Sequence, residues 1–134
     1  MFIFGLGYSA ARIARRLEAQ GWEVVSTGRD GTLRFDDRDN VGLALADSSH
    51  ILSSVPPSGE GLDPVLEVYG DRLGGKWLGY LSSTGVYGDA RGAWVDESAP
   101  PGTGRRRPRR PGAWGWPWRG ARGSRGPLRP TPSA

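Results

Sequence analysis

The chain has 134 residues, a formal net charge of +4 and no cysteine, which excludes a disulfide-stapled fold and a thiolate zinc site. His50 is the only histidine, so a histidine-rich metal centre is excluded as well, and we expect no bound metal. No apolar run approaches the roughly 20 residues that cross a bilayer. We therefore expect a cytoplasmic protein that does not bind membranes.

The positive charge is concentrated at one end of the chain. Residues 1–101 contain all 14 acidic residues and have a net charge of −5, whereas residues 102–134 contain nine arginines, no acid and a charge of +9. We therefore expect an acidic globular body followed by a basic tail. The overall charge describes neither part.

The amino-terminal third predicts a strand, a helix and a second strand. The apolar run Phe2–Phe4 leads into a glycine-rich turn, and a strand is expected over Glu23–Thr27. Between them, apolar residues recur at the spacing of an amphipathic helix: Ala10, Ile13, Ala14 and Leu17. Units of this kind form parallel sheets.

The same alternation continues to residue 83. We predict strands over 32–35, 50–55 and 77–83, and helices over 41–46 and 62–70. The sequence thus predicts an α/β protein with a doubly wound parallel Rossmann sheet. It would have about five strands in the order 3-2-1-4-5, with helices on both faces.

The glycine turn carries a dinucleotide-binding fingerprint. The segment Gly5-Leu6-Gly7-Tyr8-Ser9-Ala10 has the spacing GxGxxA and lies between the expected strand and helix, which is the context that the fingerprint requires. Gly5 permits a tight turn, Gly7 lets the backbone approach a diphosphate, and Ala10 lets the helix pack closely on the sheet. The diphosphate would lie at the positive end of the helix.

The ends of the other strands supply further candidate cofactor contacts. Arg29 follows the second strand and favours NADP, because a guanidinium suits the 2′-phosphate, although the adjacent Asp30 leaves NAD as a second candidate. Asp36 follows the third strand, where an adenine ring would lie. Val55 and Pro56 lie at the end of the fourth strand and are expected to form a wall of the cofactor site.

A second motif lies at the end of the fifth strand, in the segment 80–89, Tyr-Leu-Ser-Ser-Thr-Gly-Val-Tyr-Gly-Asp. Together with the glycine turn, it resembles the extended and atypical short-chain dehydrogenase/reductases, the NAD-dependent epimerase/dehydratase family. The resemblance covers residues 1–101. It implies that Ser83, with Thr84 beside it, supplies a catalytic hydroxyl to a sugar-like or other small carbonyl or alcohol substrate during hydride transfer.

Two features depart from the family's pattern. The catalytic Tyr-x-x-x-Lys pair of the family is absent, because the only lysine is Lys76 and Arg72 stands four residues before it. Family members are also about twice as long, so the resemblance implies a carboxyl-terminally truncated member that lacks most of a substrate region. A non-catalytic dinucleotide-binding or sensor module is therefore the alternative function.

The tail over 102–134 is composed mainly of Arg, Gly and Pro and contains one aliphatic residue larger than alanine, Leu128. Such a composition predicts disorder. Its arginines and three tryptophans are compatible with a nucleic-acid-binding arm. Because its residues are those of GC-rich codons, we favour instead a sequence translated out of frame, and nucleic acid becomes a lesser alternative.

Overall fold

The computed structural model describes residues 1–58, 62–82, 87 and 90–96. The expectations for the tail at 102–134 therefore lie outside the described residues. The elements, in chain order, are β1 (Phe2–Phe4), α1 (Tyr8–Glu18), β2 (Val25–Ser26), α2 (Arg38–Asp47), β3 (His50–Ser53), α3 (Pro64–Tyr69), the 3₁₀ helix η1 (Gly70–Arg72) and β4 (Trp77–Tyr80). This is a mixed α/β architecture of the Rossmann-like kind.

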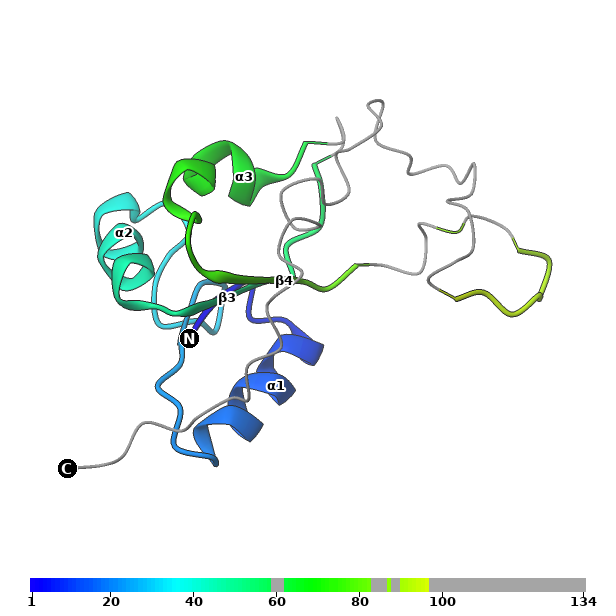
Figure 1. Cartoon of the computed structure of the whole chain (residues 1–134), viewed down its shortest axis with the longest axis horizontal. Helices are drawn as coiled ribbons and strands as arrows, with labels where there is room; N and C mark the ends of the chain where they lie inside the picture. The colour runs from blue at the N-terminus through cyan, green and yellow to red at the C-terminus, as the bar shows by residue number, and fades with distance from the viewer. Residues whose placement is uncertain (59–61, 83–86, 88–89, 97–134) are drawn as a thin grey trace.

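The four strands form one parallel sheet in the order β2-β1-β3-β4. Phe2 is paired with Val25 on one side and with Ile51 on the other, which makes β1 a central strand. Because parallel neighbours need a crossover, each connection passes over a face of the sheet. α1 covers one face, and α2 and α3 cover the other (Figure 1).

Two apolar clusters fill the space between the sheet and the helices. The larger one lies on the side of α2 and α3 and is built from buried residues of both helices, of β1 and β3, and of the end of η1: Phe2, Phe4, Val41, Leu45, Ile51, Val65, Tyr69 and Leu73. The smaller one lies beneath α1 and comprises Ile3, Ala10, Ala14 and Leu52. The small side chains of α1 let it pack closely on the sheet, as the fingerprint requires.

Two helices differ in their bounds from the predicted ranges because side chains cap them. Asp37 accepts a hydrogen bond from the Asn40 amide at 3.3 Å, so α2 begins earlier than expected. Asp63 accepts a hydrogen bond from the Val65 amide at 2.9 Å, so α3 begins at Pro64 and leaves Leu62 outside the helix. In both cases the cap satisfies amides that a helix start leaves unpaired.

The expected strand over 32–35 is not a strand in this structure. A single parallel bridge joins Leu33 to Thr27. The Thr32 hydroxyl takes the position that a neighbouring strand would occupy. Its oxygen accepts a hydrogen bond from the Ser26 amide at 2.9 Å, and its O–H donates to the Ser26 carbonyl at 3.1 Å. A full parallel crossover needs a dozen or more residues, and this connection is far shorter.

Among the described residues, no helix combines the length and apolar character needed to cross a membrane.

An aromatic cluster lies at the amino-terminal edge of the sheet. The His50 ring is 5.1 Å from the ring of Trp22 and 5.5 Å from that of Trp77, measured between centroids. Its Nδ1 hydrogen-bonds the Ser49 hydroxyl at 2.9 Å. Partial burial and, secondarily, the positive charge of the Met1 amino group lower the pKa of His50 below its ordinary value.

We therefore expect the free energy of unfolding to fall as the pH drops below the ordinary histidine pKa of 6.5. The unfolded chain then binds a proton that the folded chain binds less readily, so stability is gained as the pH rises. Urea unfolding over this pH range, together with an NMR titration of this single histidine, measures the effect. His50→Gln should remove this part of the pH dependence. A His50 that titrates at or above its ordinary value would contradict the expectation.

Candidate functional site

The glycine turn joins β1 to α1 through a set of short backbone contacts. Gly5 has a φ of +79°, a conformation that favours glycine. The Leu6 amide donates to the Thr27 carbonyl at 2.7 Å, and the Gly7 amide donates to the Gly5 carbonyl at 2.8 Å. The Ser54 hydroxyl donates to the Gly5 carbonyl at 2.5 Å. The turn is thus held by the ends of both neighbouring strands.

The amino terminus of α1 opens into the space above this turn. Gly7 is the N-cap and makes no side-chain hydrogen bond to the helix, and the first turn contains no acidic residue. A Cβ atom built on Gly7 meets no atom within 4 Å, so the approach to the turn is open. Helix N-termini of this kind, with unpaired amides and a positive dipole end, bind anions.

A cavity of about 570 Å³ lies over the turn at the carboxyl-terminal edge of the sheet. Its lining comes from the loops after β1, β2 and β3 and from the first turn of α1: Gly5, Leu6, Gly7, Tyr8, Ala11, Gly28, Arg29, Asp30, Ser54, Val55 and Pro56. Seven of the ten cofactor contacts expected from the sequence are therefore brought together. This is the edge at which open α/β sheets bind ligands.

Three of the expected cofactor contacts lie elsewhere. Ser9 is exposed and Ala10 is buried in the cluster beneath α1, and neither lines the cavity. Asp36 is an exposed residue in a bidentate ion pair with Arg34, with nitrogen–oxygen distances of 3.0 and 3.1 Å. This hydrogen bonding lowers the pKa of Asp36.

Gly28 is a contact that the sequence analysis did not include. It has a φ of +140°, and a Cβ atom built on it would lie 2.9 Å from the Leu6 nitrogen. The loop after β2 therefore approaches the glycine turn so closely that only glycine fits at position 28. The sequence did hold a signal for this contact, since a glycine directly follows the expected second strand.

The expected catalytic hydroxyls, Ser83 and Thr84, lie outside the described residues. The nearest tyrosine on β4, Tyr80, donates its hydroxyl to the Val55 carbonyl at 3.4 Å. Burial, aided by the negative charge of Asp63, raises the pKa of Tyr80 to about 12. Tyr80 therefore keeps its proton near neutral pH and is a poor general base.

The only lysine of the chain lies away from this cavity. Lys76 directly precedes β4, at the amino-terminal edge of the parallel sheet. Its Nζ donates to the Ala46 carbonyl at 3.1 Å and to the Ser48 carbonyl at 2.7 Å. Lys76 thus caps the carboxyl-terminal end of α2, where a cation is favourable.

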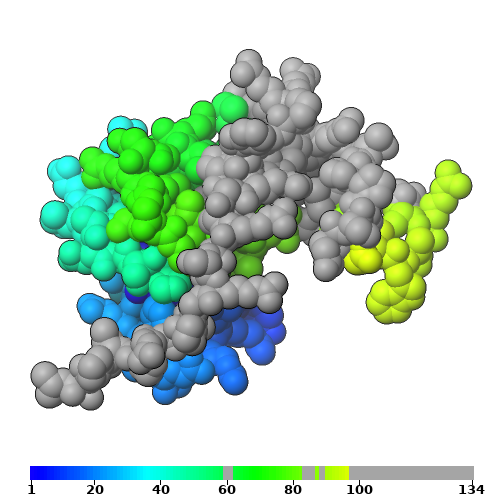
Figure 2. Space-filling model, in the orientation of Figure 1, coloured from blue at the N-terminus to red at the C-terminus, as the bar shows by residue number. Residues whose placement is uncertain are grey.

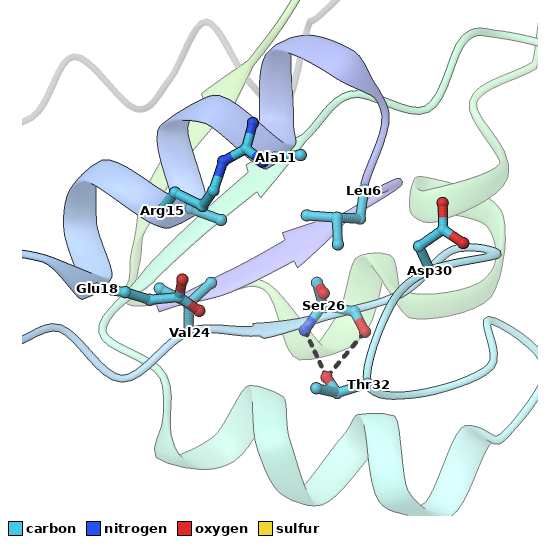
Figure 3. Close-up of a pocket in the computed structure, with 9 residues that line it drawn as sticks. Leu6, Ala11, Arg15, Glu18, Val24, Ser26, Asp30 and Thr32 are labelled. Atoms are coloured by element: carbon cyan, nitrogen blue, oxygen red, sulfur yellow. Dashed lines mark hydrogen bonds between the residues drawn. The ribbon is translucent and has the colours of Figure 1, made fainter.

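A second, smaller cavity of about 280 Å³ lies between α1 and the loop after β2 (Figure 3). It shares Leu6, Ala11 and Asp30 with the larger cavity, so the two adjoin. Its floor includes Val24, and Arg15 and Glu18 extend from α1 at its rim (Figure 3). Oppositely charged groups stand around it, which gives it no clear preference for an anion.

Comparison with known proteins gives a match to a solved structure. No protein-family model matches the sequence, and no curated protein matches it. A similar solved structure is that of a functionally unknown conserved protein from Silicibacter pomeroyi DSS, with 35% sequence identity and a TM-score of 0.60. The match covers 78% of this chain and 43% of that protein, so the chain spans less than half of its length.

The close approach of Gly28 to Leu6 gives a test of the turn. Gly28→Ala should lower the free energy of unfolding by about 2–3 kcal/mol. The alanine would adopt an unfavourable positive φ, and its Cβ atom would also clash with the Leu6 nitrogen. Gly75→Ala is the matched control: Gly75 has a φ of +75° but open space around it. That control should cost only about 1–2 kcal/mol. Equal losses in urea unfolding would contradict the close contact.

Proposed function

We propose that this chain is the NAD(P)-binding part of an oxidoreductase or epimerase-like protein, similar to the extended and atypical short-chain dehydrogenase/reductases. The observation that supports this most is the cavity over the glycine turn. It combines an open helix N-terminus with the ends of β2 and β3 at the carboxyl edge of a parallel sheet. These are the features that a dinucleotide diphosphate requires.

The residues present fit such a cofactor. Gly5 and Gly7 would hold the diphosphate, since one forms the turn and the other leaves the approach open. Val55 and Pro56 would form the wall beside it. When bound, the nicotinamide would supply hydride chemistry towards a sugar-like or other small carbonyl or alcohol substrate, with Ser83 and Thr84 hydrogen-bonding the substrate oxygen.

We further propose that NADP is preferred over NAD. Arg29 lines the cavity and is exposed, and within the described residues no ion pair engages it. A free guanidinium beside the adenosine end can pair with a 2′-phosphate through two hydrogen bonds. The neighbouring Asp30 carboxylate also lines the cavity, and it would oppose a phosphate.

A non-catalytic dinucleotide sensor is the second candidate. It is favoured by the position of Lys76, which caps α2 at the opposite edge of the sheet from the cavity. The lysine therefore cannot lower the pKa of a tyrosine at the cofactor site. Turnover of any carbonyl substrate with NADPH would exclude the sensor.

For the order of the sheet, we propose that the segment 32–35 lies beside β2 as an irregular edge segment, in the place of the outer strand of the order 3-2-1-4-5. The single parallel bridge between Thr27 and Leu33 supports this proposal.

Arg29→Gln tests the cofactor preference. NADPH binding should weaken by about tenfold or more, because a hydrogen bond to a charged group contributes about 1.5–3 kcal/mol. NADH binding should be unchanged. Isothermal titration calorimetry measures both, and Arg38→Gln, which removes an exposed arginine of α2, is the control. A wild-type chain that binds neither nucleotide would refute the proposed function; equal losses for both nucleotides would refute only the role of Arg29.

A further inference from the structure

One side of the molecule carries an exposed basic stripe. Arg12, Arg15 and Arg16 are exposed on α1 at the spacing i, i+3, i+4, which places them on one face of the helix. Tyr8 precedes them on the same face and is 76% exposed, with the Arg12 guanidinium 4.6 Å from the centre of its ring. The stripe is therefore cationic and begins with an aromatic ring.

The other side carries an acidic stripe with an apolar centre. On α2, Asp39, Leu43 and Asp47 recur every four residues and are all exposed. Leu43 is 68% exposed between the two carboxylates, whereas Val41 and Leu45 of the same helix are buried. α1 and α2 lie on opposite faces of the sheet (Figure 1), and Figure 2 shows their residues on different sides of the surface.

The charged groups of the two stripes are not engaged in ion pairs within the described part of the chain. The ion pair between Arg34 and Asp36 involves neither helix. The three arginines of α1 and the two aspartates of α2 therefore hold no ion pair there. A complementary surface can engage them without breaking an existing pair.

We propose that the basic stripe of α1 in one copy of this chain binds the acidic stripe of α2 in a second copy. At 1.5 Å per residue, Asp39 and Asp47 are about 12 Å apart along their helix and Arg12 and Arg16 about 6 Å apart. The long arginine side chains span the remaining ~3 Å at each end. Leu43, between the two aspartates, would then lie against the aliphatic stems of the arginines.

The contact joins two different surfaces, so it is heterologous. Because the two stripes lie on opposite sides of the molecule, a row of bound copies always has a free basic stripe at one end and a free acidic stripe at the other. The expected product is an open, head-to-tail chain of copies rather than a closed dimer. Charge pairs between exposed stripes are screened by salt, so the assembly forms at low ionic strength and dissociates at high ionic strength.

Sedimentation velocity of the full chain tests the assembly. At an ionic strength of about 0.01 M, the mean mass should rise with protein concentration beyond that of a dimer, and at about 1 M it should return to the monomer mass. A chain that stays monomeric at low salt over the whole concentration range would overturn the proposal.

Neutralised variants identify the surfaces. Arg12→Gln/Arg15→Gln/Arg16→Gln and Asp39→Asn/Asp47→Asn should each remain monomeric alone, because each retains only one of the two stripes. An equimolar mixture should form a dimer and nothing larger, since it offers one intact pair of stripes. Circular dichroism confirms that each variant is folded. A mixture that stays monomeric would overturn the proposal.

The control separates this contact from a general effect of net charge. Glu67→Gln/Asp71→Asn removes two exposed acids from α3 and η1, outside the stripe of α2. This variant should assemble like the unmodified chain. If it dissociates to the same degree as Asp39→Asn/Asp47→Asn, the α2 stripe is not the binding surface.

Discussion

The three residues of β1 constrain the rest of the molecule. Phe2, Ile3 and Phe4 are fully buried, and the strand they form pairs with β2 on one side and β3 on the other. Phe2 and Phe4 belong to the cluster under α2 and α3, whereas Ile3 belongs to the cluster under α1. A slip by one residue would exchange the two sets between faces, so both helix layers require this register. The same register places Gly5 at the carboxyl edge of the sheet.

Elements with a strong apolar pattern could be predicted from the sequence, and those defined by a single side chain could not. The spacing of apolar residues over 10–17 predicted α1 because that helix packs on the sheet through one face. The bounds of α2 and α3 depend on the Asp37 and Asp63 carboxylates, whose partners are not visible in an apolar pattern. The segment 32–35 has the composition of a strand, but the Thr32 hydroxyl bonds the backbone amide and carbonyl of Ser26 with which such a strand would pair.

The same distinction applies to the candidate site. Gly5, Leu6, Gly7 and Tyr8 are consecutive, so one motif predicted four lining residues at once. Ser54 and Gly28 line the cavity because each contacts the glycine turn, from which it is far away in the sequence. Asp36 was expected there from its position after a strand, but a nearby arginine pairs with it on the surface. Whether a carboxylate faces a ligand site or pairs with a nearby arginine depends on the conformation of the loop, which the sequence pattern does not give.

The hydroxyl of Thr32 also affects how the sheet meets other chains. The outward-facing amide and carbonyl of Ser26 both bond to it, and the carbonyl also accepts the Leu33 amide at 3.0 Å. An exposed strand edge is normally a template on which a foreign strand can add, and proteins protect such edges. The Thr32 hydroxyl and the Leu33 amide thus occupy the outward-facing backbone groups of Ser26, so a foreign strand finds no free partner at this residue of the β2 edge.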